Sequence, residues 1–340
     1  MADRASVEQL ARRVARRARR RFGLWEPEPG LPDTSWAASE PNPDIPETLE
    51  SFHFFAVVGT WHEADIIEAT VRNARAQGCE RVFVVDNESQ DDTVVIAEQA
   101  GAILARRFHT ADYDEAERMR IMNEVVATVS EQVAAAQDVE HIWWLWLDAD
   151  EFPHAPGGLT LREYLAGLDR RFRVVGARFF NHYPDRVPEY VEGRHPLDYQ
   201  PLCDEFVYPM CAEGHRKHPL QRWDRNGPEI ICRAGFHQAT ARETVLLEPR
   251  EPVLLHHFPF RVESVTRRRL ELLVGAAGGR ASNDSQSNWH TQKRFRQLDA
   301  VYAHDWDRVE DLSPSGRRKG IHLLPWARQV APADADFARF

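Results

Sequence analysis

The stretch from His141 to Leu147 (HIWWLWL) runs directly into Asp148-Ala149-Asp150-Glu151. A run of mostly large apolar residues before a group of acids is typical of a buried strand that delivers the acids to the edge of a sheet. On an extended chain Asp148 and Asp150 point to the same side, so both can reach one divalent cation that also binds phosphate oxygens. The alternative interpretation is a strand followed by an ordinary acidic turn.

Strand and helix patterns alternate in the sequence before this stretch. Apolar runs predict strands at 53–58, 81–85 and 102–105. Helical spacing predicts helices from about Glu63 to Gly78, from Ser89 to Gly101 and over 112–136. Ser89 and Asp92 form a capping-box pattern at the start of the second of these helices. The alternation predicts a parallel, doubly wound α/β sheet, in which ligands bind at the carboxyl ends of the strands.

Candidate functional residues follow three of the predicted strand ends. These segments are Gly59–Glu63, Asp86–Asp92 and Asp148–Glu151. Because the carboxyl ends of parallel strands meet at one edge of the sheet, the joint placement is a stronger signal than any single motif. The sequence therefore predicts a ligand site at this edge.

The composition limits the class of protein. A chain of 340 residues with 43% hydrophobic residues is long enough for one large α/β domain with additions, or for two lobes. The net charge of −10 argues against a nucleic-acid binder. Residues 1–22 hold eight arginines against two acids, a net charge of +6, and predict a basic helix. We expect this helix to pack on the acidic body or to make a weak contact with a membrane surface, and binding of a partner is the further alternative.

Features of targeting and redox state predict a cytoplasmic protein. No apolar run approaches the ~20 residues of a membrane span, and the basic N-terminus lacks the apolar region of a secretory signal. The four cysteines include no C-x-x-C pair and are expected to be reduced thiols.

The loop after the first predicted strand lacks two common nucleotide-binding patterns. Neither G-x-G-x-x-G nor G-x-x-x-x-G-K-[ST] is present, which argues against a dinucleotide enzyme and against a P-loop NTPase. The loop Gly59-Thr60-Trp61-His62-Glu63 instead combines a glycine, at which the backbone can turn tightly, with polar and aromatic side chains suited to a base or a ribose. An ordinary β-α turn is equally compatible with these residues.

The order and spacing of the motifs resemble GT-A fold glycosyltransferases of the large family-2-like group. The matching positions are His62-Glu63 (the family usually has Asn where His62 stands), Glu68, Gly78, Asp86-Asn87-Glu88-Ser89-Gln90-Asp91-Asp92-Thr93 and Asp148-Ala149-Asp150-Glu151-Phe152. The resemblance covers roughly residues 53–275 and is strongest up to Phe152. It implies a Rossmann-like, mainly parallel GT-A sheet flanked by helices, with a mixed acceptor-side half and helical N- and C-terminal additions.

The resemblance also implies where a nucleotide-diphospho-sugar donor and a divalent cation bind. The expected contacts of the nucleoside part are Gly59, Thr60, His62, Glu63, Asp86 and Asn87. Asp148 and Asp150 are expected to hold Mn or Mg together with the diphosphate, which suits carboxylate and phosphate oxygens. Lys217 and Arg222 resemble a basic pair that clamps the diphosphate. His257 matches the position of a third metal ligand, and weaker alternatives are His237 and His256.

The second half is expected to bind the acceptor. An inverting transfer by direct displacement needs a carboxylate that takes the acceptor proton. After a predicted strand at 173–179, the family's acidic position aligns best with Glu205, and Asp204 beside it is the second candidate, with Glu213 behind them. Each of these acids is also compatible with a solvated surface position.

Four segments are expected along the chain. They are a basic helix and Pro-rich strap (1–50), a nucleotide-sugar-binding half (51–152), an acceptor and metal-completing half (153–275), and a flexible loop with a helical tail (276–340). The loop at 276–292 is a candidate lid over the donor through Trp289 and His290, and a plain linker is the alternative.

The sequence as a whole predicts a metal-dependent glycosyltransferase that acts on a carbohydrate, a lipid-linked or a small-molecule acceptor. A nucleotidyltransferase on a related fold is the first alternative, although Gly59–Asp65 lacks the Lys or Arg needed to grip a triphosphate. The second alternative is a non-catalytic nucleotide- or carbohydrate-binding module, for which the departure at His62 leaves room.

Overall fold

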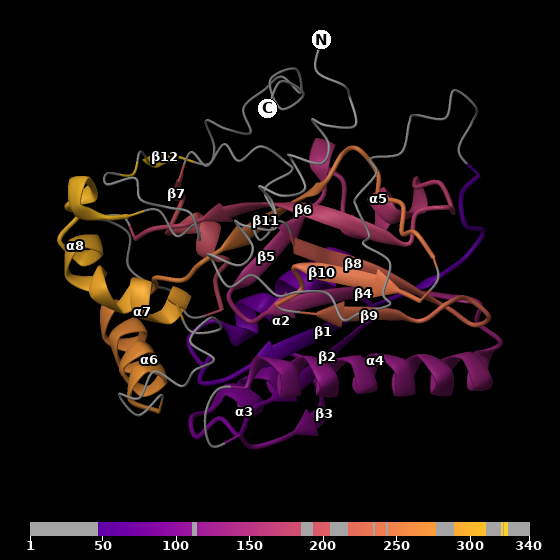
Figure 1. Cartoon of the computed structure of the whole chain (residues 1–340), viewed down its shortest axis with the longest axis horizontal. Coiled ribbons are helices and arrows are strands. Elements are labelled where there is room, and N and C mark those ends of the chain that lie inside the picture. Colours follow the sequence, from indigo (N-terminus) through magenta and orange to yellow (C-terminus); the bar gives the residue numbers. More distant parts are fainter. Residues whose placement is uncertain are drawn as a thin grey trace, which may run out of the picture.

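The computed structural model describes residues 47–110, 114–184, 193–204, 217–233, 235–242, 244–276, 289–310, 321 and 323–325. Within them, eight strands form one sheet in the order β3-β2-β1-β4-β8-β6-β11-β5 (Figure 1). These strands are β1 (His53–Thr60), β2 (Arg81–Asp86), β3 (Ile103–Arg107), β4 (His141–Asp148), β5 (Glu151–His154), β6 (Val174–Asn181), β8 (Lys217–Asp224) and β11 (Val253–His257). Two small sheets pair β9 (Ile230–Arg233) with β10 (Gln238–Ala241), and β7 (Leu202–Asp204) with β12 (Leu323–Pro325).

The helices are α2 (Ile67–Ala76), α3 (Thr93–Gln99), α4 (Glu115–Gln137), α5 (Leu161–Ala166), α6 (Glu263–Ala276), α7 (Trp289–Arg296) and α8 (Leu298–Tyr302). Short 3-10 turns lie at Pro156–Gly158, Pro196–Asp198 and Trp306–Arg308. Helices α6, α7 and α8, coloured orange to yellow, gather at one side of the molecule (Figure 1). No helix in these described stretches is long and apolar enough to cross a membrane.

The strand directions confirm the predicted fold class. β1 is parallel to β2 and β4, β2 is parallel to β3, and β6 is parallel to β11. β8 is antiparallel to β4 and β6, and β5 is antiparallel to β11. The result is a mixed, mainly parallel α/β sheet. The predicted halves 51–152 and 153–275 both contribute strands to this one sheet.

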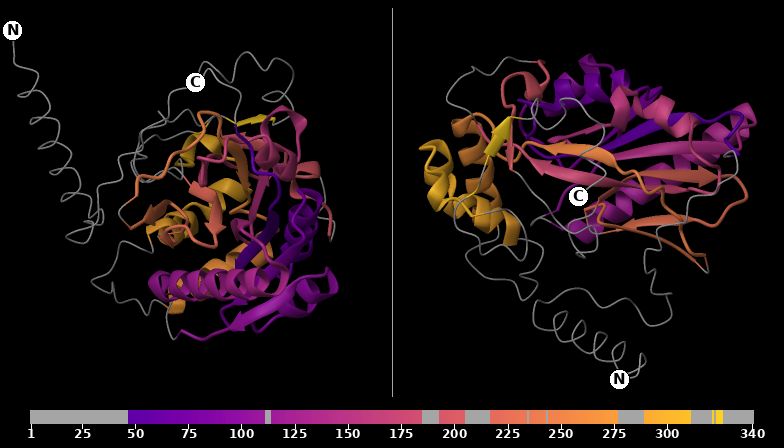
Figure 2. Two further views of the ribbon diagram at one scale, coloured as in Figure 1. Left: turned by 90° about the vertical axis from the view of Figure 1, so that its right-hand side faces the viewer. Right: turned by 90° about the horizontal axis from the view of Figure 1, so that it is seen from above.

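The sheet is buried on both faces, which explains the uninterrupted apolar runs of β1 and β4. Phe54, Ala56 and Val58 face a core that includes residues of α2, α3 and α5. Phe55 and Val57 face the opposite core, which α4 covers (Figure 2). The tryptophans of β4 divide in the same way, because successive side chains of a strand point to opposite faces: Trp143 belongs to the first core, and Trp144 and Trp146 to the second.

The sequence prediction was wrong for the start of α3 and right for the end of α2. The predicted capping box is wrong, because α3 begins at Thr93 and the Ser89 hydroxyl donates to Asp86 Oδ1 (2.6 Å) instead of capping a helix. Gly78 ends α2 as predicted, since it adopts a φ of +99° that side chains disfavour. A β-carbon there would also lie 2.5 Å from the Cβ of Arg162.

Other boundaries differ modestly. The helix expected from about Glu63 begins at Ile67, and the predicted helical tail contains α7 and α8, which are separated at Gln297. The predicted basic N-terminal helix and most of the strap lie outside the described residues, as do 277–288 of the candidate lid.

Candidate active site at the carboxyl ends of the strands

The strand register brings several predicted residues to one edge of the sheet. Thr60 at the end of β1 pairs with Asp86 at the end of β2, and Gly59 pairs with Asp148 at the end of β4. The chain then turns through Asp150 and enters β5, whose first residue Glu151 pairs with His257 of β11. Parallel strands thus place the acids and His257 on the same side of the molecule, where ligands bind in such sheets.

Asp148 is held by two cationic side chains. Arg118 of α4 donates to Oδ1 (2.5 Å) and Lys217, the first residue of β8, donates to Oδ2 (2.9 Å). Burial opposes the ionisation of Asp148, but Lys217 and Arg118 outweigh it and lower its pKa. Gly59 makes room for this contact, because a β-carbon there would lie 2.7 Å from Arg118 Nη1. The φ angle of Gly59 is not positive, so a tight turn does not require a glycine here. The glycine instead allows the Arg118 side chain to approach the backbone closely.

Lys217 joins Asp148 to the fully buried Glu151. The Lys217 ammonium donates to Glu151 Oε1 and lies 5.2 Å from the ring centre of Phe236. Burial raises the pKa of Glu151 to about 8, although the charge of Lys217 opposes that rise. The ammonium therefore has Asp148 as its main anionic partner at neutral pH.

A second group of ion pairs surrounds Asp150 and Glu63. Arg261, which follows β11, donates to Glu63 Oε2 (2.7 Å) and to Asp65 Oδ2 (2.8 Å). Arg269 of α6 donates to the other oxygen of Glu63 and lies 3.5 Å from Asp150 Oδ2. Burial raises the pKa of Glu63 to about 7 against the opposing charges of these two arginines. Arg269 thus points into the site.

His257 stands beside Asp150 with its Nε2 3.6 Å from Oδ2. On the other side of the ring, Nδ1 lies 2.7 Å from Asn181 Oδ1. Burial lowers the pKa of His257 to about 4, although Asp150 opposes that change, so the ring is neutral at neutral pH. Arg294 of α7 reaches Nε2 with Nη2 at 3.3 Å.

Arg294 is the least compensated cation at this edge. Its Nε is buried and has no hydrogen-bond partner, and its Nη2 contacts the neutral His257 ring. Burial lowers its pKa, which Asp150 partly opposes. A buried guanidinium with unused donors favours a phosphate or carboxylate ligand.

The residues fit a divalent cation in their chemistry. Asp148, Asp150 and His257 offer carboxylate oxygens and an imidazole lone pair, which suit Mn or Mg. No three His, Cys, Asp or Glu side chains already converge on a metal position in the part of the chain that the structure describes. The acids are bound to basic side chains instead. However, His257 Nε2 and Asp150 Oδ2 face each other, and a cation between them would satisfy both.

The predicted nucleoside contacts form a connected loop structure. Asp86 is fully buried and accepts hydrogen bonds from the Thr60 hydroxyl (3.1 Å) and from the Ser89 backbone (3.0 Å), with Arg107 Nε at 3.3 Å. His62 has a φ of +54°, and its backbone N–H donates to the Ser89 hydroxyl. The Asn87 amide contacts Thr110. Among the predicted nucleoside contacts, His62 and Asn87 are the partly exposed ones, and Gly59, Thr60, Glu63 and Asp86 are buried.

Two predicted residues take other positions. Arg222 pairs with Trp143 across the sheet, about 16 Å from the end of β4 at ~3.3 Å per residue, and its guanidinium binds Asp224. The structure therefore does not bring Arg222 to the acids. Asp204 is buried, and both its oxygens accept hydrogen bonds from Asn181. Glu205 and Glu213 lie outside the described residues.

Sequence reasoning missed four arginines of the site: Arg118, Arg261, Arg269 and Arg294. Arg261 and Arg294 come from positions 113 and 146 residues after Asp148, beyond the reach of any local pattern. The only available signal was the run of arginines at 267–269, and spacing alone could not show which of them turns inward.

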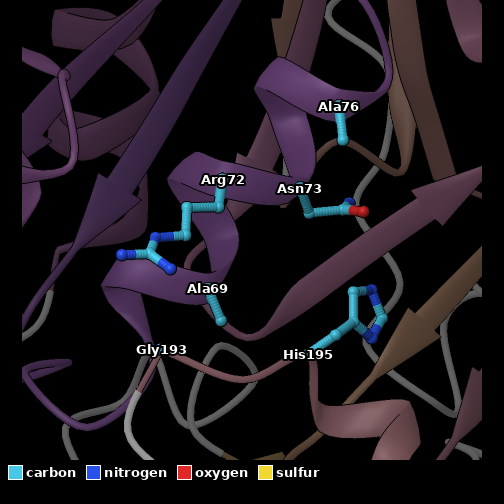
Figure 3. A pocket seen from close by; sticks show the side chains of 6 residues that line it. All are labelled: Ala69, Arg72, Asn73, Ala76, Gly193 and His195. Atoms are coloured by element: carbon cyan, nitrogen blue, oxygen red, sulfur yellow. The ribbon is translucent and has the colours of Figure 1, made fainter.

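A separate pocket of about 180 Å³ lies along α2. Its lining residues are Ala69, Arg72, Asn73, Ala76, Gly193 and His195. Figure 3 shows Asn73 and His195 on one side of the helix, with Arg72 extending toward the other. None of the predicted site residues lines this pocket.

Comparisons with known proteins give remote likenesses. No protein-family model matches the chain, and no curated protein matches it significantly. Glucosyl-3-phosphoglycerate synthase from Mycobacterium tuberculosis, in complex with Mn²⁺, uridine diphosphate and glucosyl-3-phosphoglycerate, is similar over 37% of this chain and 44% of that chain, with 17% identity and a TM-score of 0.24. S. aureus TarS 1–349 is similar over 74% of this chain and 73% of that chain, with 12% identity and a TM-score of 0.33.

The match to the first of these structures spans less than half of that chain's length. The architecture assigned here rests on the strand order and directions of the chain itself. Its function is inferred from the residues of the site.

Proposed function

We propose that the chain is a glycosyltransferase that moves a sugar from a nucleotide-diphospho-sugar to an acceptor hydroxyl, with Mn or Mg held by Asp148, Asp150 and His257. The observation that carries this proposal is the facing pair of His257 Nε2 and Asp150 Oδ2, 3.6 Å apart, at the carboxyl ends of the strands. Both atoms are acceptors, and the cationic side chains of Arg261, Arg269 and Arg294 lie around them. A dication would bind the two acceptor atoms, and an anionic diphosphate would bind the cationic side chains.

The charges of the site support the same ligand pair. Six carboxylates (Glu63, Asp65, Glu115, Asp148, Asp150 and Glu151) face five cationic side chains (Arg118, Lys217, Arg261, Arg269 and Arg294). With Glu151 protonated at neutral pH, the other five carboxylates balance the five cations, so a dication and a diphosphate can enter together with little net change. We expect the basic side chains to turn from the carboxylates to phosphate oxygens as the ligands bind.

The chain's own groups would bind and orient the donor. When bound, the metal supplies Lewis-acid stabilisation of the departing diphosphate. Arg294 and Lys217 contact phosphate oxygens, and their positive charge lowers the energy of the leaving group. His62 and Asn87, which are partly exposed, are the proposed contacts of the base and ribose. Asp86 holds their loop through Thr60 and Ser89, and Glu63 positions Arg261 and Arg269.

The proposed reaction is a direct displacement. The acceptor oxygen forms a bond to the anomeric carbon while the bond from that carbon to the phosphate oxygen breaks, and the nucleoside diphosphate leaves with the electron pair. The acceptor proton passes to a carboxylate, for which Glu205 remains the predicted base. Asp204 is a weaker candidate, because its buried oxygens accept hydrogen bonds from Asn181. The proposed acceptor is a carbohydrate, a lipid-linked molecule or a small molecule.

The test is release of nucleoside diphosphate from a panel of nucleotide-sugars with Mn, with Mg and with a chelator. Wild type should turn over one donor class only with the metal present, and Asp150→Asn should reduce the rate at least 100-fold. Asp307→Asn, which changes an exposed acid of a 3-10 turn, is the matched control and should retain full activity. Metal-independent turnover, or full activity in Asp150→Asn, would contradict the proposal.

A further inference from the structure

We propose that Asn181 and Asp204 are positioning residues that fix the ring tautomer of His257, so that its Nε2 lone pair faces Asp150 and is open to a divalent cation. The role toward a cation rests on the proposed function. The tautomer itself follows from hydrogen bonds within the chain. The three side chains are each at least nine-tenths buried, at 7%, 3% and 5% exposure for Asn181, Asp204 and His257.

The first step is the orientation of the Asn181 amide. The carboxylate of Asp204, at the end of β7, accepts from the Asn181 backbone N–H (3.0 Å) and from its side-chain Nδ2 (3.1 Å). An ionised carboxylate can only accept hydrogen bonds, so the NH₂ group of the amide must face it. The amide oxygen Oδ1 therefore points the other way.

The second step transfers that orientation to the histidine ring. Asn181 and His257 are register partners on the parallel strands β6 and β11, and Asn181 Oδ1 lies 2.7 Å from His257 Nδ1. An amide oxygen can only accept, so Nδ1 must carry the hydrogen. A neutral imidazole has one N–H, which leaves Nε2 as an acceptor. Arg294 agrees with this assignment, because a guanidinium can only donate and its Nη2 lies 3.3 Å from Nε2.

The third step concerns the opposite tautomer. With the hydrogen on Nε2, the ring would donate to Asp150 Oδ2 after a small approach from 3.6 Å, and Nε2 would have no lone pair for a cation. Metal-binding histidines commonly use the second ring nitrogen in a hydrogen bond that prevents this, and loss of such a bond lowers metal affinity about 10- to 100-fold. The chain Asp204–Asn181–His257 provides that bond here.

The first test reads the tautomer directly by ¹⁵N NMR of histidine-labelled protein without metal, with the His257 signals assigned from the spectrum of His257→Gln. Wild type should show His257 protonated at Nδ1. Asn181→Leu, which removes the acceptor, should move the hydrogen to Nε2. Asn123→Leu is the matched control, since Asn123 bonds Met119 and Cys232 far from His257, and should leave the tautomer unchanged.

The second test measures Mn²⁺ affinity by electron paramagnetic resonance on the same proteins. Asn181→Leu should bind Mn²⁺ about 10- to 100-fold more weakly than wild type, and Asn123→Leu equally well. Asp204→Asn, which releases the amide orientation but keeps the shape, should show an intermediate loss.

The two tests separate this proposal from the function of the site. An Nε2-protonated His257 in wild type overturns the proposal without any variant, even if Asn181→Leu does not fold. Equal Mn²⁺ affinity in wild type and folded Asn181→Leu overturns the positioning role while the proposed function stands. Wild type that binds no Mn²⁺ overturns the proposed function and the role toward the cation together.

Discussion

Replacing Lys217 by Met tests whether Lys217 forms the central ion pair of the site with Asp148. Lys217 is 6% exposed, donates to Asp148 Oδ2 at 2.9 Å and also contacts Glu151. Methionine keeps most of the aliphatic stem and removes the ammonium group, which donates to the two acids and lies 5.6 and 5.2 Å from the ring centres of Phe179 and Phe236. The change therefore isolates the electrostatic part of the contact.

The expected loss of stability is about 3 kcal/mol, at the low end of the ~3–5 kcal/mol range for breaking a buried ion pair. The low end applies because Asp148 keeps Arg118 and because Glu151, whose pKa burial raises to about 8, can remain protonated without the lysine. Asp148→Asn should be milder, since Lys217 then keeps Glu151. The double variant should be less destabilised than the sum of the single variants by about 1 kcal/mol or more.

The assay is urea unfolding at pH 7, followed by tryptophan fluorescence. Arg120→Met is the control, because Arg120 is a solvent-exposed cation of α4 that pairs with Glu117 and Glu124, and its midpoint should stay unchanged. A loss below ~1 kcal/mol for Lys217→Met, or strictly additive single variants, would refute the assignment of Lys217 to Asp148.

Three further predictions concern pH, packing and the unpaired arginine. Burial lowers the pKa of several histidines, among them His154 to about 4, His182 to about 3 and His195 to about 4. The unfolded chain takes up these protons first, so stability should fall as pH drops from about 6.5 toward 4, by about 1.4 kcal/mol per pH unit for each group. Urea midpoints between pH 7 and 5 check this slope, which His154→Phe should reduce; an equal slope in that variant would exclude His154 as a source. Gly59→Ala should displace Arg118 from Asp148, destabilise the fold by about 1–3 kcal/mol and weaken nucleotide binding, and unchanged binding by calorimetry would contradict the close approach. Arg294→Met should weaken nucleoside diphosphate binding at least tenfold while leaving the urea midpoint within error, and a large loss of stability instead would point to a structural role.

The first half of the fold was predictable because its signals are local. The apolar run of β4, the acids at its end and the alternation before it follow from side-chain burial on both faces of a parallel sheet. The meeting of Asp86 and Asp148 at one edge then follows from strand direction alone. The capping-box prediction failed because the Ser89 hydroxyl has a better partner in the buried Asp86 carboxylate, which local sequence does not reveal.

The site itself was only partly predictable, because its cations come from distant segments. Arg118 lies on the helix before β4, and Arg269 and Arg294 come from helices near the C-terminal end, so their convergence depends on tertiary packing. The prediction that Lys217 and Arg222 act as a pair failed because it did not consider that both residues lie on one strand. Five residues apart on β8, they point to opposite faces and lie about 16 Å apart, so both could not reach one diphosphate.

The most direct test of the donor site is a thermal shift measurement with a panel of nucleoside diphosphates and nucleotide-sugars, with and without Mn, on wild type and on Asp150→Ala. The account predicts that one nucleotide class stabilises wild type only when Mn is present, and that the stabilisation disappears in the variant. The absence of any shift with every nucleotide on folded wild-type protein, or an equal shift in Asp150→Ala, would contradict it.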